Sequence, residues 1–111
     1  MAAGESSAIN GKRFIEAVLL GYDVLCRMSK TLGPGRVRSG HRNPLNICGC
    51  YGAVVAAGKV LGLDKEQMTS ALSLTGSQAS GLLTWRTEKE HMLKSFEMGV
   101  AARNGITAAL L

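Results

Sequence analysis

Two stretches of this chain are rich in glycine and alanine placed at helical spacing. The first contains Gly49, Gly52, Ala53, Ala56, Ala57 and Gly58, and the second contains Gly99, Ala101, Ala102, Gly105, Ala108 and Ala109. Small side chains on one face of a helix let a neighbouring helix approach closely, whereas glycine lowers the intrinsic stability of a helix. We therefore expect both stretches to form helices that depend on close tertiary packing.

The remaining apolar pattern is also helical, and it predicts an all-α bundle of about four helices. Few prolines and a low aromatic content argue against a β-sandwich. We expect a flexible segment at residues 1–9, followed by a helical domain at residues 10–111. The expected elements are helices at 11–32, 44–61 and 65–77, a loop at 33–43, a loop or short helix at 82–93, and a helix that begins between 92 and 97.

Capping residues predict where these helices begin and end. Asn10 and Asn43 are suited to the N-cap position, and Pro44 is suited to the first turn. Asp64 with Gln67 resembles a capping box, and Gly62 fits the position just after a helix. The apolar pattern still runs at Leu111 without a stop signal, so we expect the chain to be an excised piece of a longer one.

The charge balance leaves three classes of partner open. Thirteen basic residues against eight acidic ones give a net charge of +5, which fits nucleic acid, a small polyanion or an acidic protein surface. The basic residues form no long helical stripe and are not interleaved with aromatic residues, so nucleic acid is the least favoured partner. The sequence has no signal peptide and no apolar run of membrane-spanning length, so we expect a cytoplasmic protein without a membrane partner.

The three cysteines, Cys26, Cys48 and Cys50, do not form a disulfide framework, because their number is odd. Cys48 and Cys50 could supply two metal ligands, but a closed zinc site needs four. We expect buried thiols and no metal site.

Two short stretches carry the residues that could bind or transform an anion. Lys94 comes just before a small-sided helix, where free N–H groups add to its positive field and favour a carboxylate. Arg36, Arg38 and His41 lie in the basic 33–43 loop, and arginine binds carboxylates through a bidentate fork. His41 and His91 could each act as an acid or base near neutral pH. The alternative is that these residues form a solvated loop and a surface lysine.

Three motifs in a fixed order resemble the helical domain of the MmgE/PrpD family. They are the stretch from Asn43-Pro44 to Gly62-Leu63, the stretch from Ala71-Leu72 to Gly76-Ser-Gln-Ala-Ser-Gly81, and the stretch from Lys94 to Leu111, preceded by Gly21 to Pro34. The resemblance implies an all-helical domain in a dimeric enzyme that works without a metal or organic cofactor. It also implies a small di- or tricarboxylic acid as substrate, with chemistry next to a carboxylate. Lys94 matches the active-site lysine of the family.

The chain departs from the family pattern at two positions. Asn43 stands where the family usually has histidine, and Glu97 stands where it often has another. Asn43 is therefore expected to contact the substrate, and His41 is a candidate replacement for the first histidine. The family chain is several times longer, so we expect the isolated chain to be inactive. The alternative class is a non-catalytic helical module for interaction or oligomerisation.

Overall fold

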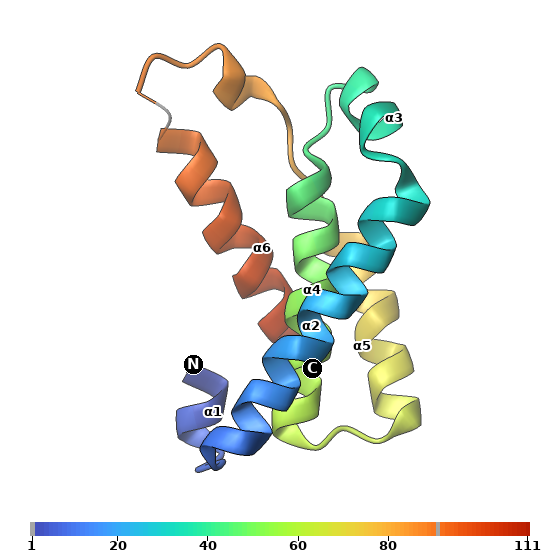
Figure 1. Cartoon of the computed structure of the whole chain (residues 1–111), viewed down its shortest axis with the longest axis vertical. Helices are drawn as coiled ribbons and strands as arrows, with labels where there is room; N and C mark the ends of the chain where they lie inside the picture. Colours follow the sequence, from blue (N-terminus) through green and yellow to red (C-terminus); the bar gives the residue numbers. More distant parts are fainter. Residues whose placement is uncertain (1, 91) are drawn as a thin grey trace.

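The computed structural model describes residues 2–90 and 92–111, and its described part is all-helical (Figure 1). The elements are α1 (Ala2–Ser6), α2 (Gly11–Leu32), α3 (Pro34–Ser39), α4 (Pro44–Leu61), α5 (Lys65–Gln78), a 3₁₀ turn η1 (Thr84–Arg86) and α6 (Met92–Leu110). The described residues contain one isolated β-bridge, between Arg42 and Leu82, and no strand. The all-α prediction is confirmed, and the four predicted helices are α2, α4, α5 and α6.

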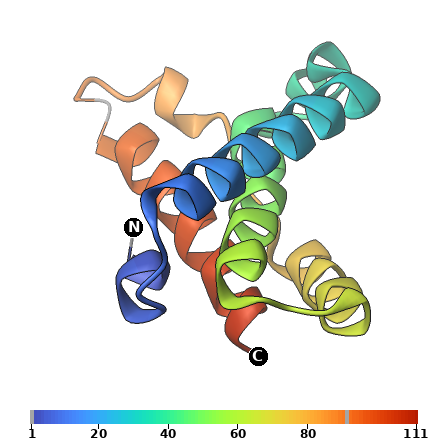
Figure 2. The same ribbon diagram turned by 60° about the horizontal axis from the view of Figure 1, so that its bottom comes forward.

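Helix α4 is the centre of the fold, with α2 crossing one side and α6 the other (Figures 1 and 2). The crossing of α2 and α4 is close because glycine faces glycine: a Cβ added to Gly21 would lie 2.7 Å from the Gly52 carbonyl oxygen. A Cβ added to Gly105 of α6 would lie 2.6 Å from the Cys50 carbonyl oxygen of α4. The small residues therefore do what their spacing predicts, which is to bring three helices into backbone contact.

The core is built from small and medium side chains of three helices. Its buried members are Val54, Val55, Ala57, Ala71, Ala108 and Ala109, and larger side chains such as Met68, Leu72 and Ile106 close it at the edges. Burial of apolar surface stabilises the fold by roughly 25 cal/mol per Å². Alanines bury little area each, so close approach of the helices supplies contacts that larger side chains would otherwise make.

The predicted helix caps are confirmed. The Asn10 side chain accepts a hydrogen bond from the Arg13 N–H, and Asn43 accepts one from the Leu45 N–H. Asp64 and Gln67 form the reciprocal capping box, each side chain accepting from the other's backbone N–H at 2.9 Å. Gly62 ends α4 in the left-handed region at φ 78°, which a side chain would disfavour.

Two short helices add to the predicted pattern. The predicted loop at 33–43 is wrong in its first part, because α3 occupies Pro34–Ser39 with proline in the first turn, where its missing N–H costs nothing. Within residues 1–9, helix α1 was not predicted. Its Gly4 lies against Ile9 and Phe14, and α1 also packs against α4, so these contacts replace the intrinsic stability that five residues lack. The predicted domain boundary near residue 10 stays a prediction.

The cysteines divide into two groups. Cys48 and Cys50 are buried in α4, and burial raises the pKa of both thiols. Cys26 is exposed on α2, so the expectation of three buried thiols is wrong for this residue. The close contacts of α2 with Gly52 of α4 are made by Gly21 and Leu25 instead.

Helix α4 is long and apolar enough to cross a membrane by length and composition, contrary to the sequence interpretation that no such run exists. In this fold 56% of the helix is buried against other helices, an arrangement also typical of the core helix of a globular domain.

Candidate functional site

Two loops, one just before α4 and one just after α5, run side by side and form what we call the polar end of the molecule. The Asn43 N–H donates to the Gly81 carbonyl at 3.0 Å, and the Leu83 N–H donates to the His41 carbonyl at 3.0 Å. Gly81 lies so close to Asn46 that an added Cβ would be 2.6 Å from the Asn46 Cβ, so only glycine fits there. This bridge fixes the loop after α5 against the start of α4.

Asn43 lies at the centre of this end and is only 2% exposed. Its side-chain oxygen caps α4, and its Nδ2 donates to Glu97 Oε2 at 2.9 Å and to Asn46 Oδ1 at 3.4 Å. The other Glu97 oxygen accepts from the Leu82 N–H at 3.2 Å. The two positions that depart from the family pattern are therefore hydrogen-bonded to each other across α4 and α6.

Lys94 lies one turn before Glu97 on α6, and its ammonium faces the ring of Trp85. The distance from Lys94 Nζ to the centre of the ring is 5.2 Å, within the range of a cation–π interaction. Trp85 is carried by η1, so the 3₁₀ turn sets the position of the ring. This contact gives the lysine a preferred orientation although its side chain is exposed.

Asn43, Trp85 and Lys94 lie around a cavity of about 330 Å³. Its walls come from α3, the start of α4, the segment around η1 and α6, and its lining residues are Arg38, Asn43, Leu45, Leu83, Trp85, Arg86 and Lys94. The volume is at the lower end of that of small-molecule sites, about 300–1,000 Å³. We call it the cationic cavity.

Every charged side chain among the described residues that line the cationic cavity is positive. Arg38, Arg86 and Lys94 are cations, and none of them forms a salt bridge with another residue that the structure describes. Arginine binds a carboxylate by two parallel hydrogen bonds, and lysine binds it as a point charge. The arrangement can hold a small anion that carries more than one carboxylate.

Three of the predicted site residues line the cationic cavity together: Lys94, Arg38 and Asn43. Arg36 lies on α3 but does not line it, and His41 contributes its backbone carbonyl to the bridge while its side chain is exposed. His91, the other predicted acid or base, lies outside the described residues. Within residues 2–90 and 92–111, no group of three metal-binding side chains comes together.

Sequence reasoning missed Arg86 and Trp85 as lining residues and Glu97 as a link between helices. Trp85 is the sole tryptophan and precedes a charged run, a pattern that marked the segment as ambiguous rather than as a wall of a site. No local pattern pairs Glu97 with Asn43, because 54 positions separate them.

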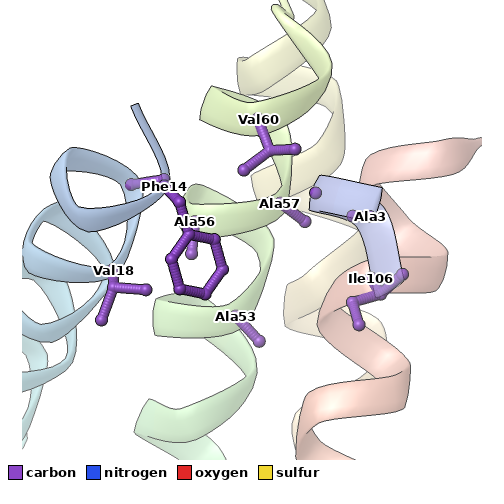
Figure 3. Close-up of a pocket in the computed structure, with 10 residues that line it drawn as sticks. Ala3, Phe14, Val18, Ala53, Ala56, Ala57, Val60 and Ile106 are labelled. Atoms are coloured by element: carbon purple, nitrogen blue, oxygen red, sulfur yellow. The ribbon is translucent and has the colours of Figure 1, made fainter. Parts of the chain in front are cut away.

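A second cavity, of about 160 Å³, lies among α1, α2, α4 and α6. Figure 3 shows that Phe14 of α2 points toward Ala56 of α4, with Ala3 of α1 and Ile106 of α6 on the other side. The residues that line it are apolar, apart from glycine. It therefore offers no group for binding or transforming an anion.

Comparison with known proteins gives the family of the chain. Residues 1–111 match the family model of the MmgE/PrpD N-terminal domain. Over 98% of its own length, the chain is 33% identical to a cis-aconitate decarboxylase of Aspergillus terreus. Over 95% of its own length, it is 31% identical to a cis-aconitate decarboxylase-like protein of Aspergillus oryzae. The chain belongs to the MmgE/PrpD family, as its motifs predicted.

The chain spans about a fifth of the length of these relatives, 22% of the first and 21% of the second. No solved structure matches it significantly. The comparison therefore gives the family and the domain of the chain, and the activity of a longer protein is a matter for proposal.

Proposed function

We propose that this chain is part of a lyase or isomerase that acts on a small di- or tricarboxylic acid without a cofactor. The reaction is a dehydration, decarboxylation or epimerisation next to a carboxylate. The observation that carries the proposal is the gathering of Arg38, Arg86 and Lys94 around one cavity, with no acidic residue among the described residues that line it. The similarity to cis-aconitate decarboxylases supports it.

The cationic cavity would contribute one wall of the substrate site. Removal of a proton, water or carbon dioxide next to a carboxylate builds up negative charge on the substrate. Fixed cations lower the barrier because they are already oriented toward that charge. In this proposal Arg38 and Arg86 hold carboxylates, and Lys94, oriented by Trp85, holds another or assists proton transfer. A single wall does not complete an active site, so the 111-residue chain is expected to bind but not to turn over substrate.

The chain contains a matched pair of arginines for testing this. Arg38 and Arg36 lie on the same short helix and carry the same charge, but only Arg38 lines the cavity. Because Trp85 is the sole tryptophan, its fluorescence reports on this cavity alone. In a titration with citrate at about 0.15 M salt, where the Debye length is about 8 Å, Arg38→Ala should weaken binding about tenfold, the equivalent of one charge-assisted contact, and Lys94→Ala should do the same.

Arg36→Ala is the control and should change citrate affinity by less than twofold, because surface charges contribute little at a distance. Acetate should bind far more weakly than citrate. Equal effects of the two arginine variants, or no saturable citrate binding, would contradict the proposal.

A second candidate function, oligomerisation, is favoured by an exposed apolar row on α2. Ile15, Leu19 and Tyr22 are 59%, 63% and 64% exposed, and they follow one another at helical spacing. An uncharged apolar row is complementary to itself, so we propose that a second copy of the chain covers it.

Light scattering tests this second proposal. It should give twice the mass of 11.7 kDa for the chain and the single mass for Leu19→Lys. Leu110→Lys, at a residue that is 67% exposed on α6, is the control and should remain dimeric. A single mass for the unmodified chain would contradict this candidate.

A further inference from the structure

We infer that Glu97 is a positioning residue of the cationic cavity, because its carboxylate ties together the separate segments that form the cavity walls. The inference rests on the proposed function of that cavity, and it gives a role to a residue that does not itself line it.

Both oxygens of the Glu97 carboxylate are used, and each binds a different segment. Oε2 accepts from Nδ2 of Asn43 at the start of α4, at 2.9 Å. Oε1 accepts from the backbone N–H of Leu82 in the loop after α5, at 3.2 Å. Hydrogen bonds to an ionised carboxylate are about twice as strong as those between neutral groups. One side chain therefore holds two segments that have no covalent connection near this point.

Each segment that Glu97 holds carries lining residues of the cavity. Asn43 is a lining residue, and Leu82 is followed directly by Leu83 and then by Trp85 and Arg86. Glu97 itself lies one turn after Lys94 on α6, so the third wall belongs to the same helix. Loss of the carboxylate would release the loop from α6 and let Trp85 move relative to Lys94.

The surroundings of Glu97 also explain how a negative charge can lie close to a site for anions. The side chain is half-buried, and its oxygens face hydrogen-bond donors. A carboxylate with an electrostatic effect alone would repel a bound anion, so its removal would tighten anion binding. A carboxylate that positions the walls has the opposite effect on binding when it is removed. The sign of the change separates the two roles.

The experiment compares Glu97→Ala, Glu97→Gln and Glu90→Ala in the 111-residue chain. Glu90 is exposed and lies four positions before Lys94, so its variant loses the same charge nearby without breaking either hydrogen bond. Citrate affinity is measured by Trp85 fluorescence, and hydrogen exchange of the Leu82 amide is measured by NMR. Far-UV circular dichroism checks that each variant is folded.

We expect Glu97→Ala to weaken citrate binding about tenfold and to speed exchange of the Leu82 amide by a similar factor, as the loss of a charge-assisted hydrogen bond implies. Glu97→Gln keeps one acceptor oxygen and should lie between the alanine variant and the unmodified chain. Glu90→Ala should leave exchange unchanged and affinity the same or slightly higher. If Glu97→Ala does not fold, the comparison of Glu97→Gln with Glu90→Ala decides.

Unchanged or tighter citrate binding by a folded Glu97 variant overturns the inference, and so does unchanged exchange at Leu82. If the unmodified chain does not bind citrate, the proposed function fails. The Leu82 exchange then decides the positioning role by itself: faster exchange in the Glu97 variants supports it, and unchanged exchange refutes it.

Discussion

Gly105 and Gly99 lie on the same helix, α6, yet their surroundings differ completely. A Cβ on Gly105 would meet Ala53, the Cys50 carbonyl and the Val54 amide within 2.7 Å, whereas a Cβ on Gly99 would meet nothing within 4 Å. One end of α6 is in backbone contact with α4, and the other end diverges from it and carries Lys94 (Figure 1). The comparison shows that the small-residue pattern predicts packing at one end of this helix only.

The largest expected effect concerns cysteine reactivity at the packed end. The thiolate is the reactive form, and burial raises the pKa of Cys48 and Cys50. In the native chain an aromatic disulfide reagent at pH 8 should label Cys26 rapidly. The two buried thiols should react slower by a factor of about a thousand or more, because reaction requires unfolding. Mass spectrometry of the labelled chain gives the number and position of the modified residues.

The same two thiols give a pH dependence of stability. A raised pKa means that the folded state holds the thiol protons more tightly than the unfolded state. Their contribution is therefore present below the ordinary value of 9.0 and is lost as the pH rises above it. Between pH 7 and pH 10, the urea midpoint of the unmodified chain should fall further than that of a variant with both buried cysteines replaced by alanine. An equal or smaller fall for the unmodified chain would contradict this prediction.

The next effect is a loss of stability on Gly105→Ala. Two of the three close neighbours of the added methyl group are backbone atoms of α4, which cannot turn away as a side chain can. Overpacking of this kind costs about 1–3 kcal/mol, and the gain in helix propensity offsets only part of it. We expect urea unfolding to show a net loss of about 1 kcal/mol, rising to about 2 kcal/mol where the cost of overpacking is at the upper end of its range. A variant as stable as the unmodified chain would mean that α4 and α6 are not in backbone contact here.

The smallest effect, of opposite sign, is expected for Gly99→Ala. Nothing stands near the added methyl group, and alanine favours a helix over glycine by about 0.8–1.0 kcal/mol. The variant should therefore be more stable by somewhat less than that value, measured by the same urea titration. Destabilisation at Gly99 would show that this end of α6 is covered by a partner in solution, which would remove the difference between the two glycines.

Local chemistry explains why much of the fold could be predicted from the sequence. Asn10, Asn43 and Asp64 each satisfy backbone N–H groups within three residues of themselves, and Gly62 supplies a conformation that few other residues adopt. Helix α1 could not be predicted, because a helix of five residues has little stability until α4 and Phe14 of α2 pack against it.

The site shows the same division between local and distant information. Lys94, Arg38 and Asn43 were identified from residue type and family resemblance, and the structure places them around one cavity. Trp85 and Arg86 join them because the loop after α5 is held both by the bridge to Arg42 and by the hydrogen bond from Leu82 to Glu97, and both contacts are distant in sequence. The role of Glu97 depends on a hydrogen bond between distant positions, which no periodicity records.

The separation of 54 positions between Asn43 and Glu97 also sets the order in which the molecule can assemble. Closing a long loop costs entropy that is recovered only when the distant contact forms, so such contacts form late in folding. Helices α4 and α5 are adjacent in sequence and can pair as soon as both have been synthesised. The cationic cavity and the helical core both have to wait for α6, because this helix supplies Lys94 and Glu97 at its start and the buried Ala108 and Ala109 near its end. During synthesis the ability to bind an anion would therefore appear together with the complete core and not before it.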